Sequence, residues 1–310
     1  MKAMVLEKFG GIEYLHMTEM ATPALAEGEV LIRIAYAGVN PVDWKIREGY
    51  LKDMIPHDFP IILGWDVAGT VMKVGKNVEN LRIGDEVFSY IRKPIVKWGA
   101  YAEFVAFTAA DVVRKPKNLT LAQAGALPLV SLTAWQALFD FAHVKRGETV
   151  LIQGGSGGVG SMAIQFAKWA GAKVIATAST KKHDYIKSLG ADVAIDYHED
   201  FESRIEKVDL VFDCVGGEAF TKSLPCLKRG GRIVSILEQM DPAQAKRLGI
   251  EASYVFVRPN GAQLATIADL IEKGHVKPPH IEEMRLDEAG KAQEKLKAGN
   301  VLGKIVLKVS

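Results

Sequence analysis

The chain has 310 residues, with 39 Lys and Arg against 37 Asp and Glu, and 48% of its residues are hydrophobic. At about 150 residues per domain, this length predicts two domains. The balanced charge argues against a disordered chain and against a strongly basic nucleic-acid surface. No apolar run approaches the roughly 18 to 20 residues that cross a membrane, and Glu7 and Lys8 interrupt any signal-peptide core. Because Cys214 and Cys226 form no CxxC pair, we expect a cytoplasmic protein without disulfides.

Short apolar runs, separated by Gly, Pro and Asp, fill the chain before residue 120. Many short strands at such spacing predict a barrel or sandwich. The candidate strands are Val30–Ile34, Val67–Gly75, Asp85–Tyr90 and Ala102–Ala106.

The pattern changes after Thr120. Residues 120–141 are rich in Ala, Leu and Gln, which favour helix. Strand-like and helix-like segments then alternate through Thr149–Ile152, Val159–Ala170, Lys173–Ala176, Lys181–Leu189, Val193–Ile195, Leu210–Phe212 and Arg232–Ile236. Repeated βα units predict a mostly parallel, doubly wound sheet.

The tail differs again, with helical patterns at Leu264–Lys273 and Leu286–Ala298 and a final strand at Lys304–Val309. The predicted fold class is therefore α/β. A β-rich domain spans residues 1–122 and is completed by 272–310, and a doubly wound Rossmann domain with a parallel sheet spans 123–271.

The strongest local motif is Gly155-Ser156-Gly157-Gly158-Val159-Gly160, a G-x-G-x-x-G pattern between a strand and an amphipathic helix. Glycine allows the tight turn and lets the backbone approach a pyrophosphate, while the helix N-terminus offers unpaired N–H groups to the anion. The motif predicts a dinucleotide site; a glycine turn that only packs helix on sheet is the alternative.

The end of the next strand selects the nucleotide. An NAD site carries Asp or Glu about 20 residues beyond the glycines, whereas this chain has Ser179, Thr180, Lys181 and Lys182 there. Hydroxyls and lysines suit the 2′-phosphate of NADPH, so Ser179, Lys181 and Lys182 are candidate cofactor residues. The alternative is that the two lysines only begin a solvated helix.

Four segments together resemble the medium-chain dehydrogenase/reductase superfamily, over essentially the whole chain. They are Gly38–Lys45, Gly64–Gly69, Gly84–Val87 and Gly155–Gly160. The resemblance implies a GroES-like catalytic domain followed by a Rossmann domain, and points to the zinc-independent quinone oxidoreductase and enone reductase branch. Zinc-dependent members carry Cys where Asn40 stands and His where Trp65 stands, and neither replacement ligates zinc.

The resemblance also implies hydride transfer from NADPH to a quinone or an α,β-unsaturated carbonyl. Such chemistry needs oxyanion stabilisation and a proton donor. Asn40, which matches a position beside the nicotinamide, Lys45 and Tyr50 are the candidate catalytic residues. Each has an alternative: Asn40 forms a turn, Lys45 is a solvated surface residue, and Tyr50 only packs. Asp43 is expected to hold the loop.

Further cofactor contacts are implied by the same resemblance. Thr133 matches a position that faces the nicotinamide, and Tyr197 follows the third strand, near the adenosine. Cys214 and Val215 end the fourth strand, and Lys304 could close on the cofactor. Cys214 has no identifiable histidine partner, which favours a buried role over a nucleophilic one.

Two other functions stay open. The first is an enoyl-thioester reductase on the same scaffold, and the second is a weakly catalytic NADPH-binding protein with a regulatory or RNA-binding role, which the near-neutral charge supports little. The expected partner is a small quinone or enone, with no nucleic acid and no membrane. A homodimer is what the resemblance implies.

Overall fold

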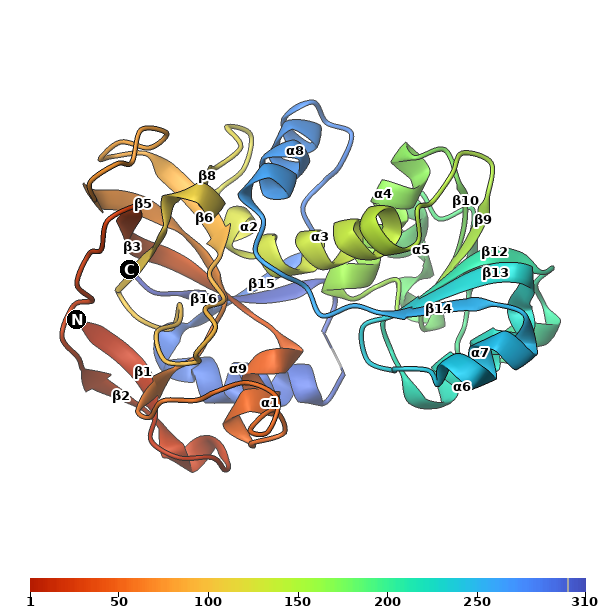
Figure 1. Cartoon of the computed structure of the whole chain (residues 1–310), viewed down its shortest axis with the longest axis horizontal. Coiled ribbons are helices and arrows are strands. Elements are labelled where there is room, and N and C mark those ends of the chain that lie inside the picture. Colours follow the sequence, from red (N-terminus) through yellow and green to blue (C-terminus); the bar gives the residue numbers. More distant parts are fainter. Residues whose placement is uncertain (300) are drawn as a thin grey trace. The chain divides into compact units, whose positions relative to one another are not determined.

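The computed structural model describes residues 1–299 and 301–310, and these residues form two compact units. Unit 1 comprises Met1–Leu129, Pro259–Glu272 and Pro278–Ser310, and unit 2 comprises Val130–Arg258 and Lys273–Lys277 (Figure 1). Within the described residues, no helix is long and apolar enough to cross a membrane.

Unit 1 is β-rich, as the sequence predicts. Its larger sheet runs in the order β15-β16-β3-β5-β6-β8, with β7 also paired to β3, and its smaller sheet runs β2-β1-β4. Most pairs are antiparallel, and β15 and β16 are parallel. The strands are β1 (Lys2–Leu6), β2 (Leu15–Glu19), β3 (Glu29–Val39), β4 (Ile61–Ile62), β5 (Asp66–Val74), β6 (Glu86–Tyr90), β7 (Phe104–Thr108), β8 (Val113–Arg114), β15 (Ile281–Arg285) and β16 (Lys304–Lys308).

Helices and 3-10 turns close this unit. They are η1 (Ile12–Tyr14), α1 (Pro41–Arg47), η2 (Ala109–Asp111), α2 (Leu121–Gly125), α8 (Gly261–Glu272), η7 (Leu286–Glu288) and α9 (Ala289–Lys297). Helix α3 (Pro128–Trp135) begins in unit 1 and continues into unit 2.

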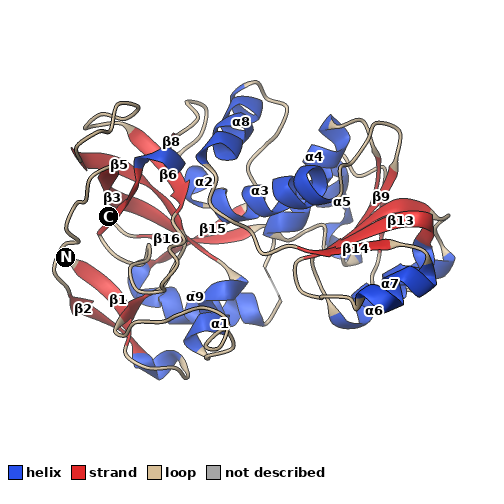
Figure 2. Ribbon diagram, viewed as in Figure 1, coloured by secondary structure: helices blue, strands red, loops and turns tan. Residues whose placement is uncertain are grey.

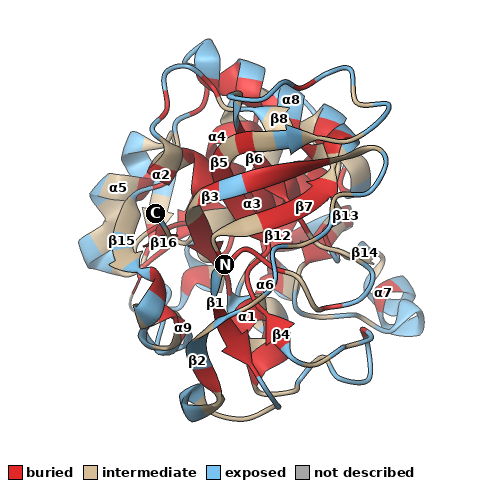
Figure 3. Cartoon of the chain, turned by 90° about the vertical axis from the view of Figure 1, so that its left-hand side faces the viewer, coloured by how far each residue is buried: buried red, intermediate tan, exposed pale blue. Residues whose placement is uncertain are grey.

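Strand β3 lies at the centre of the larger sheet, where it pairs with β16, β5 and β7. Its side chains are buried over most of its length, and Figure 3 draws it mostly in red. At Gly69 of β5, a Cβ atom would lie 2.0 Å from the carbonyl oxygen of Arg33. Glycine there lets β5 approach β3 closely, which fits the role of glycine inside a strand.

Unit 2 contains a sheet whose strands are all parallel, in the order β11-β10-β9-β12-β13-β14 (Figure 2). This is the doubly wound order 3-2-1-4-5-6, and it confirms the predicted Rossmann fold. The strands are β9 (Thr149–Ile152), β10 (Lys173–Thr177), β11 (Val193–Ile195), β12 (Val208–Asp213), β13 (Leu227–Ser235) and β14 (Glu251–Tyr254). Its helical segments are η3, a π-helix (Gln136–Phe141), α4 (Gly158–Trp169), η4 (Thr180–Lys182), α5 (His183–Ser188), η5 (Phe201–Ser203), α6 (Gly217–Ser223), η6 (Leu224–Cys226) and α7 (Pro242–Leu248).

The two units and the predicted domains differ at their borders. Residues 123–129 and 259–271, which the sequence analysis assigned to the Rossmann domain, lie in unit 1. There α2 packs on β3 and β5. The Asn118 side-chain amide donates to the Ile271 carbonyl oxygen of α8 over 2.9 Å. The functional borders at 122 and 272 stay a prediction.

The segment around Asn40 is more regular than the sequence analysis expected. The sequence analysis gives a turn at Asn40 as one alternative, but β3 runs to Val39 and α1 begins at Pro41. Proline suits the first position of a helix because its missing N–H is not needed there. Asn40 therefore stands at the junction of a strand and a helix rather than within a loose turn.

Candidate active site

The glycine segment joins β9 to α4 as predicted. Gly154 has a φ of +70°, which favours glycine. The Gly155 N–H donates to the Thr177 carbonyl oxygen over 2.8 Å, and the Gly157 N–H donates to Gly154 over 3.1 Å. These bonds hold the turn against the end of β10.

The glycines of the motif serve different purposes. A Cβ atom on Gly160 would lie 2.2 Å from the carbonyl oxygen of Gly154, whereas one on Gly157 would lie 3.5 Å from the same atom. Gly160 is thus required by packing of the helix on the turn. Gly157 has room for a methyl group, so its lack of a side chain matters for what approaches from outside.

The start of α4 fits an anionic ligand. Its N-cap is Gly157, no side chain caps it, and its first turn contains no acidic residue. The N–H groups of the first helical turn lack intrahelical partners, and the helix dipole favours negative charge at this end. The turn therefore fits a pyrophosphate group.

Buried polar side chains that the sequence analysis missed support the turn. Gln153 accepts a hydrogen bond from the Thr177 hydroxyl over 2.5 Å and donates to the Ser223 hydroxyl over 2.8 Å. The Thr177 hydroxyl also accepts from the Gly154 N–H over 3.1 Å. All three side chains are buried. The sequence signal for Gln153 is its place as a polar residue directly after the apolar strand β9.

The candidate 2′-phosphate residues follow β10, and Tyr197, the candidate adenosine residue, follows the neighbouring strand β11. Strands β10 and β11 are paired in parallel up to Thr177 and Ile195, so their following segments begin at the same sheet edge. Lys181 and Tyr197 are exposed, and Ser179 and Lys182 are partly buried. The structure thus brings together Ser179, Lys181, Lys182 and Tyr197, in the region where a doubly wound sheet binds the adenosine end of a dinucleotide.

The remaining cofactor candidates of unit 2 are Thr133, Cys214 and Val215, which differ in how far they are exposed. Thr133 is buried in α3. Val215 is half exposed at the end of β12, and its methyl carbon lies 3.0 Å from where a Cβ on Gly154 would stand. Burial and the neighbouring Asp213 raise the pKa of the Cys214 thiol well above its usual value. A neutral thiol is a poor nucleophile, which agrees with a packing role.

In unit 1, Asn40 belongs to a buried polar cluster. Its amide nitrogen Nδ2 donates to Oδ2 of Asp66 over 2.8 Å, and its Oδ1 accepts from Nζ of Lys304 over 2.6 Å. Lys304 also donates to the carbonyl oxygen of Val39 over 2.7 Å and lies 3.5 Å from Asp66 Oδ2. An anion on one side and a cation on the other determine the orientation of the Asn40 carboxamide.

Asp43 completes this cluster. Its Oδ2 accepts from the backbone N–H of Asn40 and from the Tyr101 hydroxyl, each over 2.8 Å. It thus holds the start of α1, as expected. Burial raises the pKa of Asp43 to about 7. Burial also raises the pKa of Asp66 and lowers that of Lys304, while the attraction between these two opposes both shifts.

Lys45 and Tyr50 lie at the C-terminal end of α1, whereas Asn40 precedes the first residue of that helix. Lys45 is on the last turn of the helix, with Nζ 5.8 Å from the Trp44 ring centre. The Tyr50 ring packs edge-on to Trp44 at 5.8 Å and is 66% exposed. Burial lowers the pKa of Lys45, and no carboxylate in the described part of the chain pairs with it. The structure therefore groups two of the three catalytic candidates around Trp44 and places Asn40 elsewhere.

Lys304 makes hydrogen bonds within unit 1 that the sequence analysis did not predict. Its side chain is almost fully buried, and its ammonium is bonded to Asn40 and Val39 of unit 1. A direct cofactor contact by Lys304 stays a prediction.

Asn40 and Trp65 stand at the two positions where zinc-dependent members of the superfamily carry zinc ligands, and both side chains have other contacts. Asn40 is hydrogen-bonded to an ammonium, and the buried Trp65 ring packs edge-on to Tyr90 at 6.1 Å. Across residues 1–299 and 301–310, no three His, Cys, Asp or Glu side chains form a group that could hold a metal ion.

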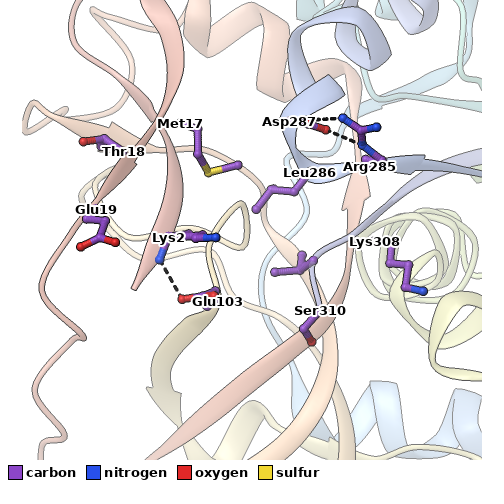
Figure 4. A pocket seen from close by; sticks show the side chains of 11 residues that line it. Lys2, Met17, Thr18, Glu19, Glu103, Arg285, Leu286, Asp287, Lys308 and Ser310 are labelled. Atoms are coloured by element: carbon purple, nitrogen blue, oxygen red, sulfur yellow. Dashed lines mark hydrogen bonds and ion pairs between the residues drawn. The ribbon is translucent and has the colours of Figure 1, made fainter.

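An open hollow of about 670 Å³ lies elsewhere on unit 1 (Figure 4). Its lining residues are Lys2, Met17, Thr18, Glu19, Glu103, Arg285, Leu286, Asp287, Lys308, Val309 and Ser310. The Lys2 backbone N–H donates to Glu103 over 2.7 Å, and Arg285 Nε donates to Asp287 over 2.9 Å. No candidate site residue lines this hollow.

A 3-2-1-4-5-6 sheet with a glycine turn between its first strand and helix defines the class of dinucleotide-binding α/β proteins. Comparison with known families refines this class. Residues 26–117 match the family described as "Alcohol dehydrogenase GroES-like domain", and residues 189–307 match that described as "Zinc-binding dehydrogenase".

Individual proteins match over nearly the whole chain. A "2-methylene-furan-3-one reductase" of Solanum lycopersicum is 38% identical over 99% of this chain and 79% of its own length. An "NADPH-dependent alkenal/one oxidoreductase, chloroplastic" of Arabidopsis thaliana is 37% identical over 90% of this chain and 71% of its own. The structure of a quinone oxidoreductase from Coxiella burnetii superposes with a TM-score of 0.90 at 36% identity, covering 100% of this chain and 99% of that one. The chain belongs to the medium-chain dehydrogenase/reductase superfamily, in its branch of quinone and enone oxidoreductases.

Proposed function

We propose that this protein is an NADPH-dependent reductase that delivers hydride to quinones or α,β-unsaturated carbonyl compounds without a zinc ion. The observation that carries the proposal is the uncapped α4 N-terminus behind the glycine turn of a 3-2-1-4-5-6 sheet. It is a pyrophosphate site in a chain whose relatives are named as reductases and oxidoreductases of enones, alkenals and quinones.

The preference for NADPH over NADH rests on the segment after β10. Ser179, Lys181 and Lys182 supply a hydroxyl and two cations, where an NAD site would place a carboxylate. The Arabidopsis relative is named NADPH-dependent, in agreement with this assignment. We assign the backbone of Gly155–Gly160 to the pyrophosphate and Thr133, Cys214 and Val215 to the nicotinamide end.

When bound, NADPH supplies the hydride. The chain must then stabilise the negative charge that develops on the carbonyl oxygen of the substrate and supply a proton. Lys45 suits this task because burial lowers its pKa and no carboxylate in the described residues neutralises it. Asn40 is a carboxamide of fixed orientation, and we assign Tyr50, an exposed phenol that packs on the Trp44 ring, to the border of the substrate site.

The side chains at the two zinc-ligand positions do not fit a zinc ion. Trp65 offers no ligand atom, and the Asn40 oxygen already accepts from the Lys304 ammonium. A divalent cation at this place would meet that positive charge. The polar cluster therefore performs a positioning task in the region that carries metal ligands in zinc-dependent enzymes.

A substrate panel tests the proposal. The purified chain is mixed with NADPH and small quinones, short enones or enoyl thioesters, and the absorbance of reduced nicotinamide is followed. We expect turnover of quinones or enones that survives treatment with a chelator and fails with NADH. Turnover of thioesters alone would favour an enoyl-thioester reductase. NADPH binding without turnover would favour a regulatory or RNA-binding protein, and turnover that requires zinc would refute the proposal.

Two lesser predictions accompany the function. We expect a homodimer, which sedimentation or light scattering would test. We also expect a cytoplasmic location, consistent with two unpaired cysteines, and localisation of a tagged protein would test it.

A further inference from the structure

Strand β11 has an aspartate on each side. Asp192 precedes it and Asp196 follows it. In a doubly wound sheet, ligands bind beyond the carboxyl ends of the strands. Only Asp196 is therefore at the functional edge, and the sequence analysis gave it no role.

The Asp196 carboxylate joins two segments of the candidate cofactor site. Its Oδ2 accepts from the Thr180 backbone N–H over 2.8 Å and also from the Thr180 hydroxyl. Its Oδ1 accepts from the His198 backbone N–H over 3.0 Å and lies 2.7 Å from Nδ1 of the same residue. One side chain thus ties the turn after β10 to the turn after β11.

Both turns carry candidate NADPH residues. Thr180 lies between Ser179 and Lys181, and the Ala178 N–H donates to the Ile195 carbonyl oxygen over 3.0 Å just before them. On the other side, Tyr197 lies between Asp196 and His198, and its ring centre is 4.1 Å from that of His198. The side chain of Asp196 is only 13% exposed between these turns.

The hydrogen bonds to Asp196 stabilise its negative charge. The Thr180 hydroxyl and the His198 N–H hold the pKa of Asp196 well below its usual range. The carboxylate is therefore ionised near neutral pH, and its oxygens accept from donors of the two turns. Its contribution to phosphate binding is therefore to order the segment that carries the two lysines, not to attract the phosphate itself.

We infer that Asp196 is a positioning residue for recognition of the 2′-phosphate of NADPH. It orders the turn that carries Ser179, Lys181 and Lys182 against the turn that carries Tyr197. This inference rests on the proposed NADPH site and adds a residue that selects NADPH over NADH. Ordering these turns before binding lowers the entropy cost of gathering the phosphate-binding groups.

The test measures binding rather than turnover. Dissociation constants of the full-length chain are measured for NADPH and NADH, and for 2′,5′-ADP and AMP as probes with and without the 2′-phosphate. In Asp196→Asn we expect affinity for NADPH and 2′,5′-ADP to fall about fivefold to tenfold, which is the net contribution of about one hydrogen bond. Affinity for NADH and AMP should stay within about twofold.

Two further variants sharpen the result. Thr180→Val removes only the hydroxyl from the bridge, so we expect a smaller loss of NADPH affinity in the same direction. Asp192→Asn is the matched control, because Asp192 accepts from the Val174 N–H over 2.7 Å and pairs with Lys168 at the opposite end of β11. Its NADPH to NADH ratio should equal that of the wild type.

The outcomes separate this inference from the proposed function. Equal losses for NADPH and NADH in Asp196→Asn, or no loss, would overturn the positioning role while leaving the reductase intact. A wild-type chain that binds neither nucleotide would overturn both. If Asp196→Asn does not fold, Thr180→Val decides alone, and an unchanged ratio there would overturn the inference.

Discussion

The two candidate sites of this chain differ in composition, because one consists of backbone groups and the other of side chains. The proposed pyrophosphate site of unit 2 consists of backbone, and its parts are contiguous from Gly154 to Gly160. The cluster of unit 1 is made of polar and charged side chains, and its bond between Asn40 and Lys304 spans 264 positions. A backbone site depends on space that side chains leave free, whereas a side-chain cluster depends on charges that must all be present. The two regions should therefore respond differently to substitution.

Removal of one charge from the cluster should have the largest effect. Lys304→Met leaves the buried carboxylate of Asp66 without its cation and the Asn40 oxygen without a donor. Breaking a buried pair from one side costs about 3 to 5 kcal/mol of unfolding free energy. Chemical denaturation measures this loss.

The double variant Lys304→Met/Asp66→Asn provides the control. It removes both charges, so its loss of unfolding free energy should be smaller than the sum of the losses in the two single variants. A double-mutant cycle measures this difference. If the single variant unfolds like the wild type, or if the losses simply add, the cluster does not depend on charge pairing.

A side chain added to the glycine turn should have the next largest effect. In Gly160→Ala the new Cβ would lie 2.2 Å from the Gly154 oxygen, and overpacking of this kind costs about 3 kcal/mol. Gly157→Ala is the matched control, because its Cβ would meet ordinary contact at 3.5 Å. It should keep its melting temperature and lose nucleotide affinity only. Equal melting temperatures for both variants would contradict the assigned roles.

The same contrast explains what could be predicted from the sequence. The glycine turn and the parallel, doubly wound sheet could be predicted from a local motif and from repeated βα units. Asp66 and Tyr101 could not be found in this way, because only the fold brings them to Asn40 and Asp43. Lys304 was singled out by resemblance, yet its bonds to Asn40 and Val39 were not foreseen. Asp196 was missed because its partner Thr180 lies on a neighbouring strand's turn.

Lys45 belongs to neither kind of site, since it is partly buried and unpaired among the described residues. If it donates the proton, Lys45→Met should lower kcat about 100-fold, or about 2.7 kcal/mol. Activity should also fall as pH rises through the lowered pKa of this lysine, because a general acid must be protonated. Steady-state kinetics across pH measures both effects.

Two variants test the assignment further. Lys45→Arg keeps a charge that persists to higher pH, so the alkaline fall should move upward. Tyr50→Phe should leave the rate unchanged if Tyr50 only packs on Trp44. An unchanged rate in Lys45→Met would remove Lys45 from the mechanism.

Asp43 should also make stability depend on pH, and per pH unit this is the smallest of the expected effects. Burial raises its folded-state pKa from 3.8 to about 7. Between these values the folded protein holds a proton that the unfolded chain has released, so stability falls as pH rises and levels off above about 7. The contribution is at most about 1.4 kcal/mol per pH unit.

Asp43→Asn should flatten this slope, because its carboxamide oxygen still accepts from Asn40 and Tyr101 but carries no titrating proton. Denaturation at a series of pH values should show the variant gaining stability relative to the wild type as pH rises. Asp192→Asn is the control, since ion pairing lowers the pKa of Asp192 and its contribution is constant over the same window. Parallel curves for Asp43→Asn and the wild type would mean that the cluster holds Asp43 ionised throughout. The buried cluster would then hold two carboxylates, those of Asp43 and Asp66, and one ammonium, that of Lys304.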